Sequence, residues 1–418
     1  MLKALIASLA AVLVLVLVPA ALADGGKRVD ARFATFNASL NRGAEGQLIT
    51  HLSTPDNQQA KNAAETIQRV RPDVVLINEF DYDSGGAALR LFQDNYLSVS
   101  QNGAAPIRYR FRFVAESNTG IPSGFDFNNN GIVGGPEDAY GFGFYPGQFG
   151  MAVYSRYPIV RNRIRTFQKF LWKDMPGAKL PDDPATPAPR DWYSPAELNV
   201  FRLSSKSHWD LPVLIDRKVV HFLASHPTPP VFDGAEDRNG TRNFDEIRLW
   251  ADYITPGGAS YLYDDAGRRG GLSPGSLFVI AGDQNSDPLD GDSIPGAIQQ
   301  LLDHRLVNTR STPSSPGAVE QSALQGRANL THRSDPKYDT ADFADGAPGN
   351  LRVDYVLPRK NMKIVGSGVF WPLMSDPLFR LVGVFPFPTS DHRLVWVDVT
   401  VPGGHDDEAE DEDEEDDD

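Results

Sequence analysis

In this chain, acidic and amide residues directly follow several apolar runs of the sequence. In residues 277–287 (LFVIAGDQNSD), an apolar run of strand length stops at Gly282 and is followed by Asp283 and Asn285. Ligands of open α/β sheets bind at the carboxyl ends of the strands, because the chain there leaves the packed core. The pattern therefore predicts a strand that presents a carboxylate and an amide to a cleft.

Other segments repeat this arrangement. The run RFATFN ends at Asn37, DVVLI is followed closely by Glu79, and KVVHFLAS runs into His226. Asp354 stands inside the apolar run LRVDYVL, where a carboxylate is costly unless it is paired, and a histidine would be its obvious partner. A lone Asp or Asn behind a strand is usually a turn former, so chemistry is indicated only if these residues meet.

Convergence would also bring in Asp391 and His392, which precede an apolar run at residues 394–401. Two carboxylates about 4 Å apart repel by roughly 4 kcal/mol at an effective dielectric of 20, so such a group requires a cation or a protonated histidine. Carboxylate and amide oxygens suit Mg²⁺ or Mn²⁺ better than zinc. The site would suit a phosphate ester, because the metal polarises a phosphoryl oxygen while a histidine oriented by an aspartate activates water.

The elements that must position these residues alternate along the chain. Small and apolar residues recur at helical spacing over residues 54–71 and again over residues 242–254. Residues 211–224 predict a β-hairpin, whereas residues 310–349 are polar and predict a loop region. Strands interleaved with helices indicate the α/β class.

Two irregular stretches predict long insertions, at about residues 118–148 and 172–196, because ordinary connections are shorter. The first insertion matches the calcium-loop pattern D-x-[DN]-x-[DN]-G-x₅-E. Its oxygen-bearing residues are Asp126, Asn128, Asn130 and Glu137, with Gly131 at the sharp turn. The flanks lack the helix pair of an EF-hand, so a plain Asn/Gly loop is the alternative to the structural calcium site that we favour.

Residues 1–23 have the form of a secretory signal. Lys3 provides a positive start, residues 4–18 are apolar, and residues 21–23 form a small-x-small cleavage site. A membrane anchor is less favoured, because the apolar core is short for a span of about 20 residues. We expect a secreted or periplasmic protein without a stable membrane span, and its lack of cysteine requires core burial rather than disulfides.

The formal net charge of −15 is concentrated at one end of the chain. Twelve of the 55 acidic residues lie in the last 14 residues, so the rest carries 43 acidic against 40 basic residues. Residues 404–418 predict a disordered, solvated acidic tail. The nearly neutral remainder shows no Lys/Arg-rich stripe of the kind expected of a nucleic-acid groove, although Arg108, Arg110 and Arg112 alternate.

The ordered motifs TFN, INEFD, FGMAVYSRYP, SHPTPP, AGDQN, RVDYVL and SDH resemble those of the endonuclease/exonuclease/phosphatase superfamily. That superfamily includes pancreatic-type deoxyribonucleases, abasic-site endonucleases, sphingomyelinases and inositol-polyphosphate phosphatases. The resemblance runs from about residue 32 to 401. It implies a four-layered α/β sandwich of two mixed β-sheets packed face to face with helices outside, forming one domain over residues 24–403.

The resemblance also implies roles for the strand-end residues. Glu79 is similar to the family's main metal-binding glutamate, with Asn37 and Asp391 beside it. His392 resembles the general base and Asp354 the aspartate that orients it. Asp283 and Asn285 resemble the pair that positions water and phosphate, and His226 the histidine that donates to the phosphate or leaving group.

Some residues depart from the family pattern or extend it. The glutamate motif usually begins with Gln, and Asn78 stands in that place. Arg238 and Arg242 follow His226 closely and are candidate phosphate contacts, the alternative being a surface loop with Arg242 near a helix start.

The motif set predicts a divalent-metal-dependent phosphoesterase that hydrolyses phosphodiesters in the manner of a nuclease, as a monomer. A phosphomonoesterase or a lipid phosphodiesterase fits the nearly neutral composition equally well. A non-catalytic binding protein on the same scaffold would be expected to lack the counterparts of Glu79, Asp283 or His392, and all three are present.

Overall fold

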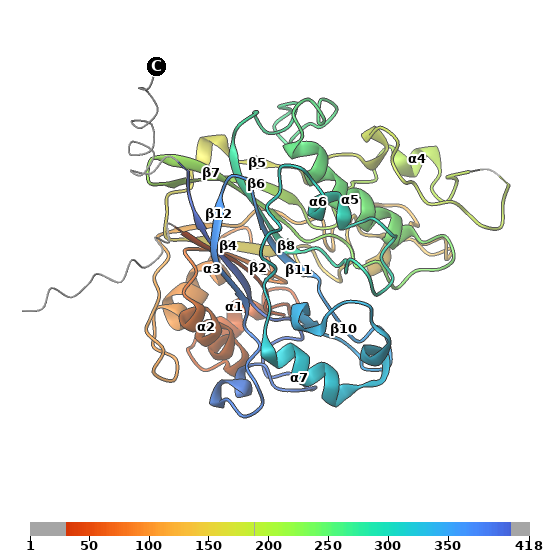
Figure 1. The fold of residues 1–418 in the computed structure, drawn as a ribbon. Helices are drawn as coiled ribbons and strands as arrows, with labels where there is room; N and C mark the ends of the chain where they lie inside the picture. The colour runs from red at the N-terminus through yellow and green to blue at the C-terminus, as the bar shows by residue number, and fades with distance from the viewer. Residues whose placement is uncertain (1–30, 188, 403–418) are drawn as a thin grey trace, which may run out of the picture.

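The computed structural model describes residues 31–187 and 189–402. The predicted secretory signal and the predicted acidic tail lie outside the described residues. Two mixed β-sheets pack face to face at the centre, and Figure 1 shows α2 on one side of them and α5 with α6 on the other. The predicted four-layered α/β sandwich is confirmed.

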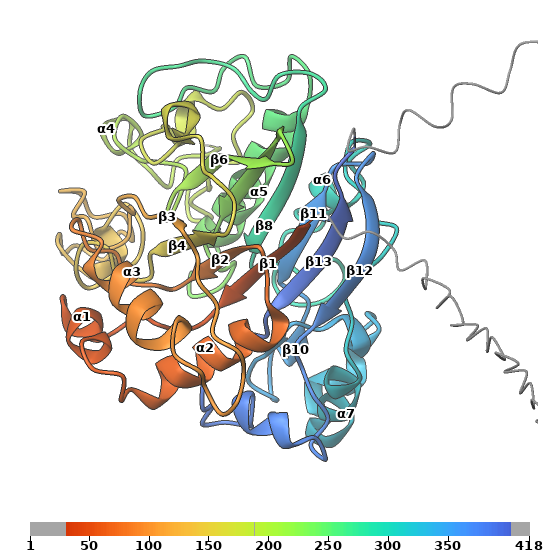
Figure 2. The same ribbon diagram turned by 90° about the vertical axis from the view of Figure 1, so that its left-hand side faces the viewer.

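The first sheet has the strand order β12-β13-β1-β2-β4-β3 (Figure 2). Its strands are β1 (Ala31–Asn37), β2 (Val74–Asn78), β3 (Phe111–Phe113), β4 (Met151–Ser155), β12 (Lys363–Val369) and β13 (Val395–Thr400). Strands β1 and β2 are parallel, and β13 is antiparallel to β1. The carboxyl ends of β1 and β2 therefore share an edge with the amino end of β13.

The second sheet has the order β11-β8-β7-β6-β5. Its strands are β5 (Arg165–Thr166), β6 (His208–Ile215), β7 (Lys218–Ser225), β8 (Leu277–Asp283) and β11 (Asp354–Pro358). Strands β6 and β7 form the predicted hairpin, β7 and β8 are parallel, and β11 runs antiparallel to β8. The carboxyl ends of β7 and β8 thus lie at one edge with the amino end of β11.

Apolar side chains on both faces of the strands build the layers. In β2, Val74 and Leu76 belong to the core between the sheets, whereas Val75 and Ile77 belong to the core under α2. Successive side chains of a strand point to opposite faces, so a continuous apolar run is required where both faces are covered. This explains why the central strands were recognisable from sequence.

The helices cover the outer faces of the sheets. They are α1 (Gln47–Leu52), α2 (Gln58–Val70), α3 (Ala87–Phe92), α4 (Pro195–Leu198), α5 (Arg238–Ile254), α6 (Gln299–Leu302) and α7 (Pro316–Gln325). Ile247 and Trp250 of α5 pack in one core with Phe278 and Ile280 of β8. No helix in the described part of the chain is long and apolar enough to cross a membrane.

Several boundaries differ from those predicted. Helix α2 starts at Gln58, because Asn57 rather than an earlier residue caps it through its side chain. The predicted loop region contains α7, and the small strands β9 (Ala341–Asp342) and β10 (Asn350–Leu351). The buried residues of α7 are Gly317, Ala318, Gln321 and Ser322, so this helix buries small and polar side chains and lacks an apolar period.

Asp339, in the same region, is only 1% exposed, and its Oδ1 has no hydrogen-bond partner among the described residues. Burial, and then the charges of Asp287, Asp290 and Asp335, raise its pKa to about 9. The folded state therefore binds a proton that the unfolded state has lost, and stability falls as pH rises from about 4 to about 9.

Asp339→Asn should therefore stabilise the protein at pH 7 by about 2 kcal/mol, with the gain fading towards pH 4. Thermal unfolding of both proteins between pH 4 and pH 9 measures this difference. Asp303→Asn is the control, because Asp303 is exposed and its charge is not among those that raise the pKa of Asp339, so its loss should bring no gain. Equal melting temperatures of wild type and Asp339→Asn at pH 7 would contradict the expectation.

Candidate active site

Four strand ends deliver the predicted residues to one rim of the sandwich. Asn37 ends β1 and Glu79 follows β2 in the first sheet. In the second sheet, Asp283 ends β8 and His226 follows β7. Parallel pairing inside each sheet aligns these carboxyl ends, and Asn37 Nδ2 lies 3.2 Å from Asp283 Oδ2, so the two sheets meet at this rim.

Two antiparallel strands complete the rim with their amino ends. Asp354 is the first residue of β11, where it pairs with Asp283 of β8. It therefore starts its strand, whereas the sequence suggested a place inside one. Asp391 and His392 precede β13, the antiparallel neighbour of β1.

Asp354 and His392 form a buried pair. Nδ1 of His392 lies 2.9 Å from Oδ2 of Asp354, which also accepts a hydrogen bond from Thr340 Oγ1 at 2.9 Å. The opposite ring nitrogen, Nε2, lies 3.6 Å from Oδ2 of Asp283. Burial opposes the charged imidazole, but the carboxylates of Asp354 and Asp283 hold the pKa of His392 well above its usual value. Because Asp354 holds Nδ1, Nε2 of His392 faces Asp283 in the site.

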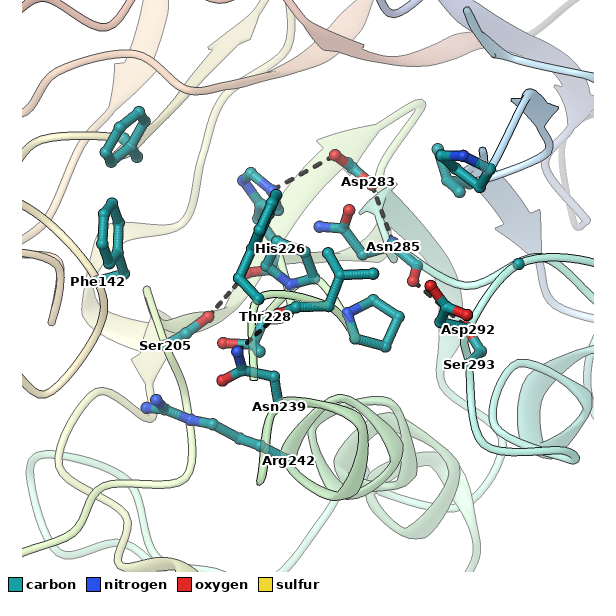
Figure 3. Close-up of a pocket in the computed structure, with 18 of the residues that line it drawn as sticks. Phe142, Ser205, His226, Thr228, Asn239, Arg242, Asp283, Asn285, Asp292 and Ser293 are labelled. Atoms are coloured by element: carbon teal, nitrogen blue, oxygen red, sulfur yellow. Dashed lines mark hydrogen bonds and ion pairs between the residues drawn. The ribbon is translucent and has the colours of Figure 1, made fainter. Parts of the chain in front are cut away.

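Asp283 occupies the centre of the cluster. Its Oδ1 accepts a hydrogen bond from the backbone N–H of Asn285 at 2.9 Å, and its Oδ2 lies 3.4 Å from Nε2 of His226 (Figure 3). Burial raises the pKa of Asp283 to about 6, although His392 opposes this effect. Burial lowers the pKa of His226 well below its usual value, so His226 is neutral and can donate a hydrogen bond from one ring nitrogen.

Glu79 is held between two amides. Asn37 Nδ2 donates to its Oε1 at 3.1 Å and Asn41 Nδ2 to its Oε2 at 2.7 Å. Burial raises the pKa of Glu79, so its charge is poorly solvated in the protein alone. Its φ of 56° lies in the left-handed region that side chains such as glutamate rarely adopt. Strain of this kind is found where the surrounding structure fixes a residue for a task.

Two further amides connect this rim. Asn285, whose φ is 51°, donates from Nδ2 to the carbonyl of Pro227 and so ties the end of β8 to the loop of His226. Asn78, which stands where the motif that the sequence resembles usually has Gln, accepts a hydrogen bond from Thr35 Oγ1 at 3.1 Å. Its Oδ1 also lies 3.4 Å from the N–H of Asp283, so the shorter amide still spans the two sheets.

The acidic cluster fits a divalent cation. Asp283, Asp354 and His392 can each offer a ligand atom within 4.8 Å of the others, and Oδ1 of Asp354 is buried without a hydrogen-bond partner among the described residues. The direct bond between His392 and Asp354 favours a catalytic pair there. The cation would then bind on the Glu79 side of the cluster. The carboxylates of Glu79, Asp283 and Asp391 all line the cleft there, and their negative charges raise the need for a cation.

Asn37 would bind such a cation through its oxygen. In the structure, its Nδ2 faces Glu79 and Asp283, while its Oδ1 accepts a hydrogen bond from the N–H of Ser39 at 3.2 Å. The amide nitrogen and oxygen must therefore exchange places before Asn37 can act as a ligand. The structure places Asn37 at the rim beside Glu79 and Asp283 and shows it as a donor.

The rim opens into a cleft of about 1030 Å³. Its walls include Glu79, Asp283, Asn285, Asp391, His392 and His226, together with the apolar side chains Phe142, Phe149, Val231, Phe232, Phe343 and Leu351. Phe142 is 47% exposed and Phe232 is 86% exposed. The cleft thus combines a polar floor with aromatic side chains that reach solvent.

The two candidate phosphate-binding arginines line this cleft but are already engaged. Arg242 donates from Nε to the carbonyl of Leu203 and from Nη2 to the carbonyls of Tyr140 and Arg202. Figure 3 shows its guanidinium directed away from Asp283. Arg238 pairs with Glu236 through Nη1. Arg242 therefore joins α5 to the first insertion, and the interactions of both arginines leave few donors for a phosphate.

Sequence reasoning missed three polar residues of this region. Asn41 binds Glu79, Thr340 binds Asp354, and Lys206 lines the cleft with only 7% exposure. Asn41 and Lys206 stand in loops without a strand pattern, and Thr340 lies in the segment that was predicted to be a loop. Only the folded chain brings them to the rim, so no local signal was available.

The predicted calcium loop is folded tightly around its own side chains. Asp126 accepts hydrogen bonds from the N–H groups of Asn130 and Gly131 at 3.1 and 2.7 Å. Asn128 accepts from the N–H of Asn130 and Asn130 from that of Ile132. Glu137 lies in a 3₁₀ turn, Pro136–Asp138, and lines the cleft.

A four-layered α/β sandwich with a buried His–Asp pair and an acidic cluster at one rim defines the class of this protein. The family model described as Endonuclease/Exonuclease/phosphatase family matches residues 34–392. The chain therefore belongs to that family. No curated protein sequence matches the chain significantly.

Several solved structures are similar to this chain at low sequence identity. An endonuclease/exonuclease/phosphatase from Beutenbergia cavernae DSM 12333 is 18% identical with a TM-score of 0.48, over 90% of this chain and 72% of that one. A family protein from Leptotrichia buccalis C-1013-b is 15% identical with a TM-score of 0.45, over 89% and 100%. Sphingomyelinase C from Streptomyces griseocarneus is 16% identical with a TM-score of 0.42, over 88% and 99%.

Proposed function

We propose that this protein is an exported, Mg²⁺-dependent phosphoesterase that hydrolyses phosphodiester bonds with a water activated by His392. The observation that carries the proposal is the orientation of His392. Asp354 holds one ring nitrogen, which leaves the other directed at Asp283 in the cleft. Family membership supports the reaction class, the hydrolysis of phosphoric esters. Mn²⁺ would suit the same oxygen ligands.

In such a reaction, each of the surrounding side chains would have a separate role. The carboxylates of Asp354 and Asp283 raise the pKa of His392, so its ring must first lose a proton. Neutral His392 then accepts the proton of the attacking water, and Asp354 fixes the ring and stabilises the imidazolium that results. Asp283 and Asn285 orient the water and the phosphate. His226 donates a hydrogen bond to the charge that develops on the phosphate or leaving group.

Glu79, Asp391 and, after exchange of its amide atoms, Asn37 would hold the cation. When bound there, Mg²⁺ supplies positive charge that polarises a phosphoryl oxygen. The raised pKa of Glu79 supports this assignment, because a buried carboxylate with poorly compensated charge gains most from a cation.

A lipid phosphodiester is a second candidate substrate, and the cleft wall favours it over nucleic acid. A nuclease needs free basic side chains along its groove, and both arginines of the cleft have protein partners. Phe142 and Phe232 instead expose apolar surface at the cleft.

A parallel assay tests the proposed function. DNA, RNA, sphingomyelin vesicles, bis-p-nitrophenyl phosphate and p-nitrophenyl phosphate are incubated with the protein in Mg²⁺, and each product is measured. We expect at least one of the phosphodiesters to be cleaved faster than the monoester p-nitrophenyl phosphate. Cleavage of the monoester alone would replace it with a phosphomonoesterase, and no cleavage of any ester would favour a binding protein.

The calcium loop gives a separate expectation. We expect calorimetry to detect Ca²⁺ binding by the wild type and none by Asp126→Ala, because Asp126 provides the first oxygen of the loop pattern. Asp182→Ala is the control, since Asp182 belongs to the other insertion. Absence of Ca²⁺ binding by the wild type, or equal binding by Asp126→Ala, would leave a plain Asn/Gly loop.

A further inference from the structure

Lys206 is a buried lysine without a partner. It is 7% exposed, and within the described part of the chain its ammonium makes no hydrogen bond and no ion pair within 4.0 Å. It lines the cleft together with Glu79, Asp283 and His226. A buried charge is costly unless it is paired, so a lysine in this position is expected to have an anionic partner that the protein itself does not provide.

The backbone on both sides of Lys206 is firmly held. The N–H of Ser205 donates to Oε1 of the buried Glu246 at 2.6 Å, and the carbonyl of Lys206 accepts from the N–H of Asn118 at 2.9 Å. Gly141 approaches so closely that a Cβ there would lie 1.8 Å from the carbonyl oxygen of Ser205. The first insertion and α5 therefore fix this loop, which indicates a defined position for the lysine.

The nearest carboxylates do not satisfy Lys206. Both oxygens of Glu246 are used by backbone N–H groups, those of Ser205 and Thr228, each at 2.6 Å. Burial lowers the pKa of Lys206, while Glu246, Glu79 and Asp283 act in the opposite direction. Its positive charge in turn contributes to keeping His226 neutral. Lys206 thus shares the electrostatic environment of the reaction centre.

We propose that Lys206 is a phosphate-binding residue, whose ammonium donates to a non-bridging oxygen of the substrate phosphodiester beside His226. The inference rests on the proposed function and adds a residue that the motif set does not contain. The lysine supplies the free cationic donor that the engaged Arg238 and Arg242 do not. Charge-assisted bonds to an anion are the strong ones, and donors aimed at developing charge accelerate the reaction.

Lys206→Met tests this assignment, because methionine keeps the apolar stem and removes the charge. We expect kcat/KM for the best diester to fall about 100-fold. The affinity for inorganic phosphate, measured by calorimetry in Mg²⁺, should fall about tenfold or more. Lys169→Met is the control, since Lys169 is exposed and does not line the cleft, and it should leave both values unchanged.

A chemical rescue separates the charge from a packing effect. The chain contains no cysteine, so Lys206→Cys introduces a single thiol. Its thiolate displaces bromide from 2-bromoethylamine and forms a thioether that restores an amine at nearly the length of lysine. Alkylation should recover at least about tenfold of the lost kcat/KM and of the lost phosphate affinity. Alkylated wild type controls for side reactions.

The phosphate measurement also separates this inference from the proposed function. If the wild type hydrolyses no ester but binds phosphate through Lys206, the anion site stands and the proposed reaction fails. If Lys206→Met binds phosphate as the wild type does, or if the wild type binds none, the assignment of Lys206 is overturned. Loss of affinity that alkylation of Lys206→Cys fails to restore would show a packing role and would equally overturn it.

Discussion

His392→Ala is expected to lower kcat for phosphodiester hydrolysis by about 10³-fold, with a smaller effect on KM. General-base catalysis contributes roughly 10²–10⁴-fold. Among the described residues, His392 is the one imidazole that a carboxylate holds through one ring nitrogen and that faces Asp283 with the other. Steady-state kinetics with bis-p-nitrophenyl phosphate in Mg²⁺ measures the change.

His304→Ala is the matched control for this substitution. His304 is a histidine outside the cleft, where its ring contacts Thr255, so its removal should leave kcat unchanged. The melting temperature of His392→Ala should also be checked, because its ring packs against Phe343. A folded His392→Ala protein with wild-type kcat would remove His392 from the mechanism.

Glu79→Gln is expected to lower both Mg²⁺ affinity and kcat, each by about 10²-fold or more, because it removes the charge of the main candidate ligand. In EDTA, where no cation is bound, the same substitution should raise the stability of the folded protein. Burial raises the pKa of Glu79, so the folded protein without metal carries an unfavourable charge near neutral pH. This destabilisation sets in as pH rises above the ordinary pKa of glutamate, and glutamine removes it.

Two measurements test the role of Glu79 as a Mg²⁺ ligand. Calorimetry gives the Mg²⁺ affinity of the wild type, Glu79→Gln and the exposed control Glu45→Gln. Thermal unfolding at pH 7 should show that Mg²⁺ raises the melting temperature of the wild type and of Glu45→Gln, but not that of Glu79→Gln. Equal Mg²⁺ stabilisation of all three proteins would place the cation elsewhere.

The rim residues were predictable because strand type and strand end are local signals. Asp283 and Asn37 directly terminate buried strands whose two apolar faces are visible in the sequence. Parallel pairing then brings such ends together without further information. The order of the motifs identified the family, and with it the antiparallel strands that carry Asp354 and His392.

The rest depends on contacts between distant segments. Asn41 reaches Glu79 from a loop, and Lys206 is positioned by Asn118 and Glu246, which lie 88 residues before and 40 residues after it in the numbering. Helix α7 could not be recognised, because it buries small and polar side chains. The conformation of Glu79, with its positive φ, is likewise imposed by the surrounding fold rather than by local preference.

In the proposed reaction, a divalent cation and His392 act together on a phosphodiester. The most direct test is the hydrolysis of bis-p-nitrophenyl phosphate by the wild type before EDTA, after EDTA and after Mg²⁺ is returned. We expect activity to disappear on chelation and to return with Mg²⁺. Hydrolysis that continues unchanged in EDTA would contradict this expectation.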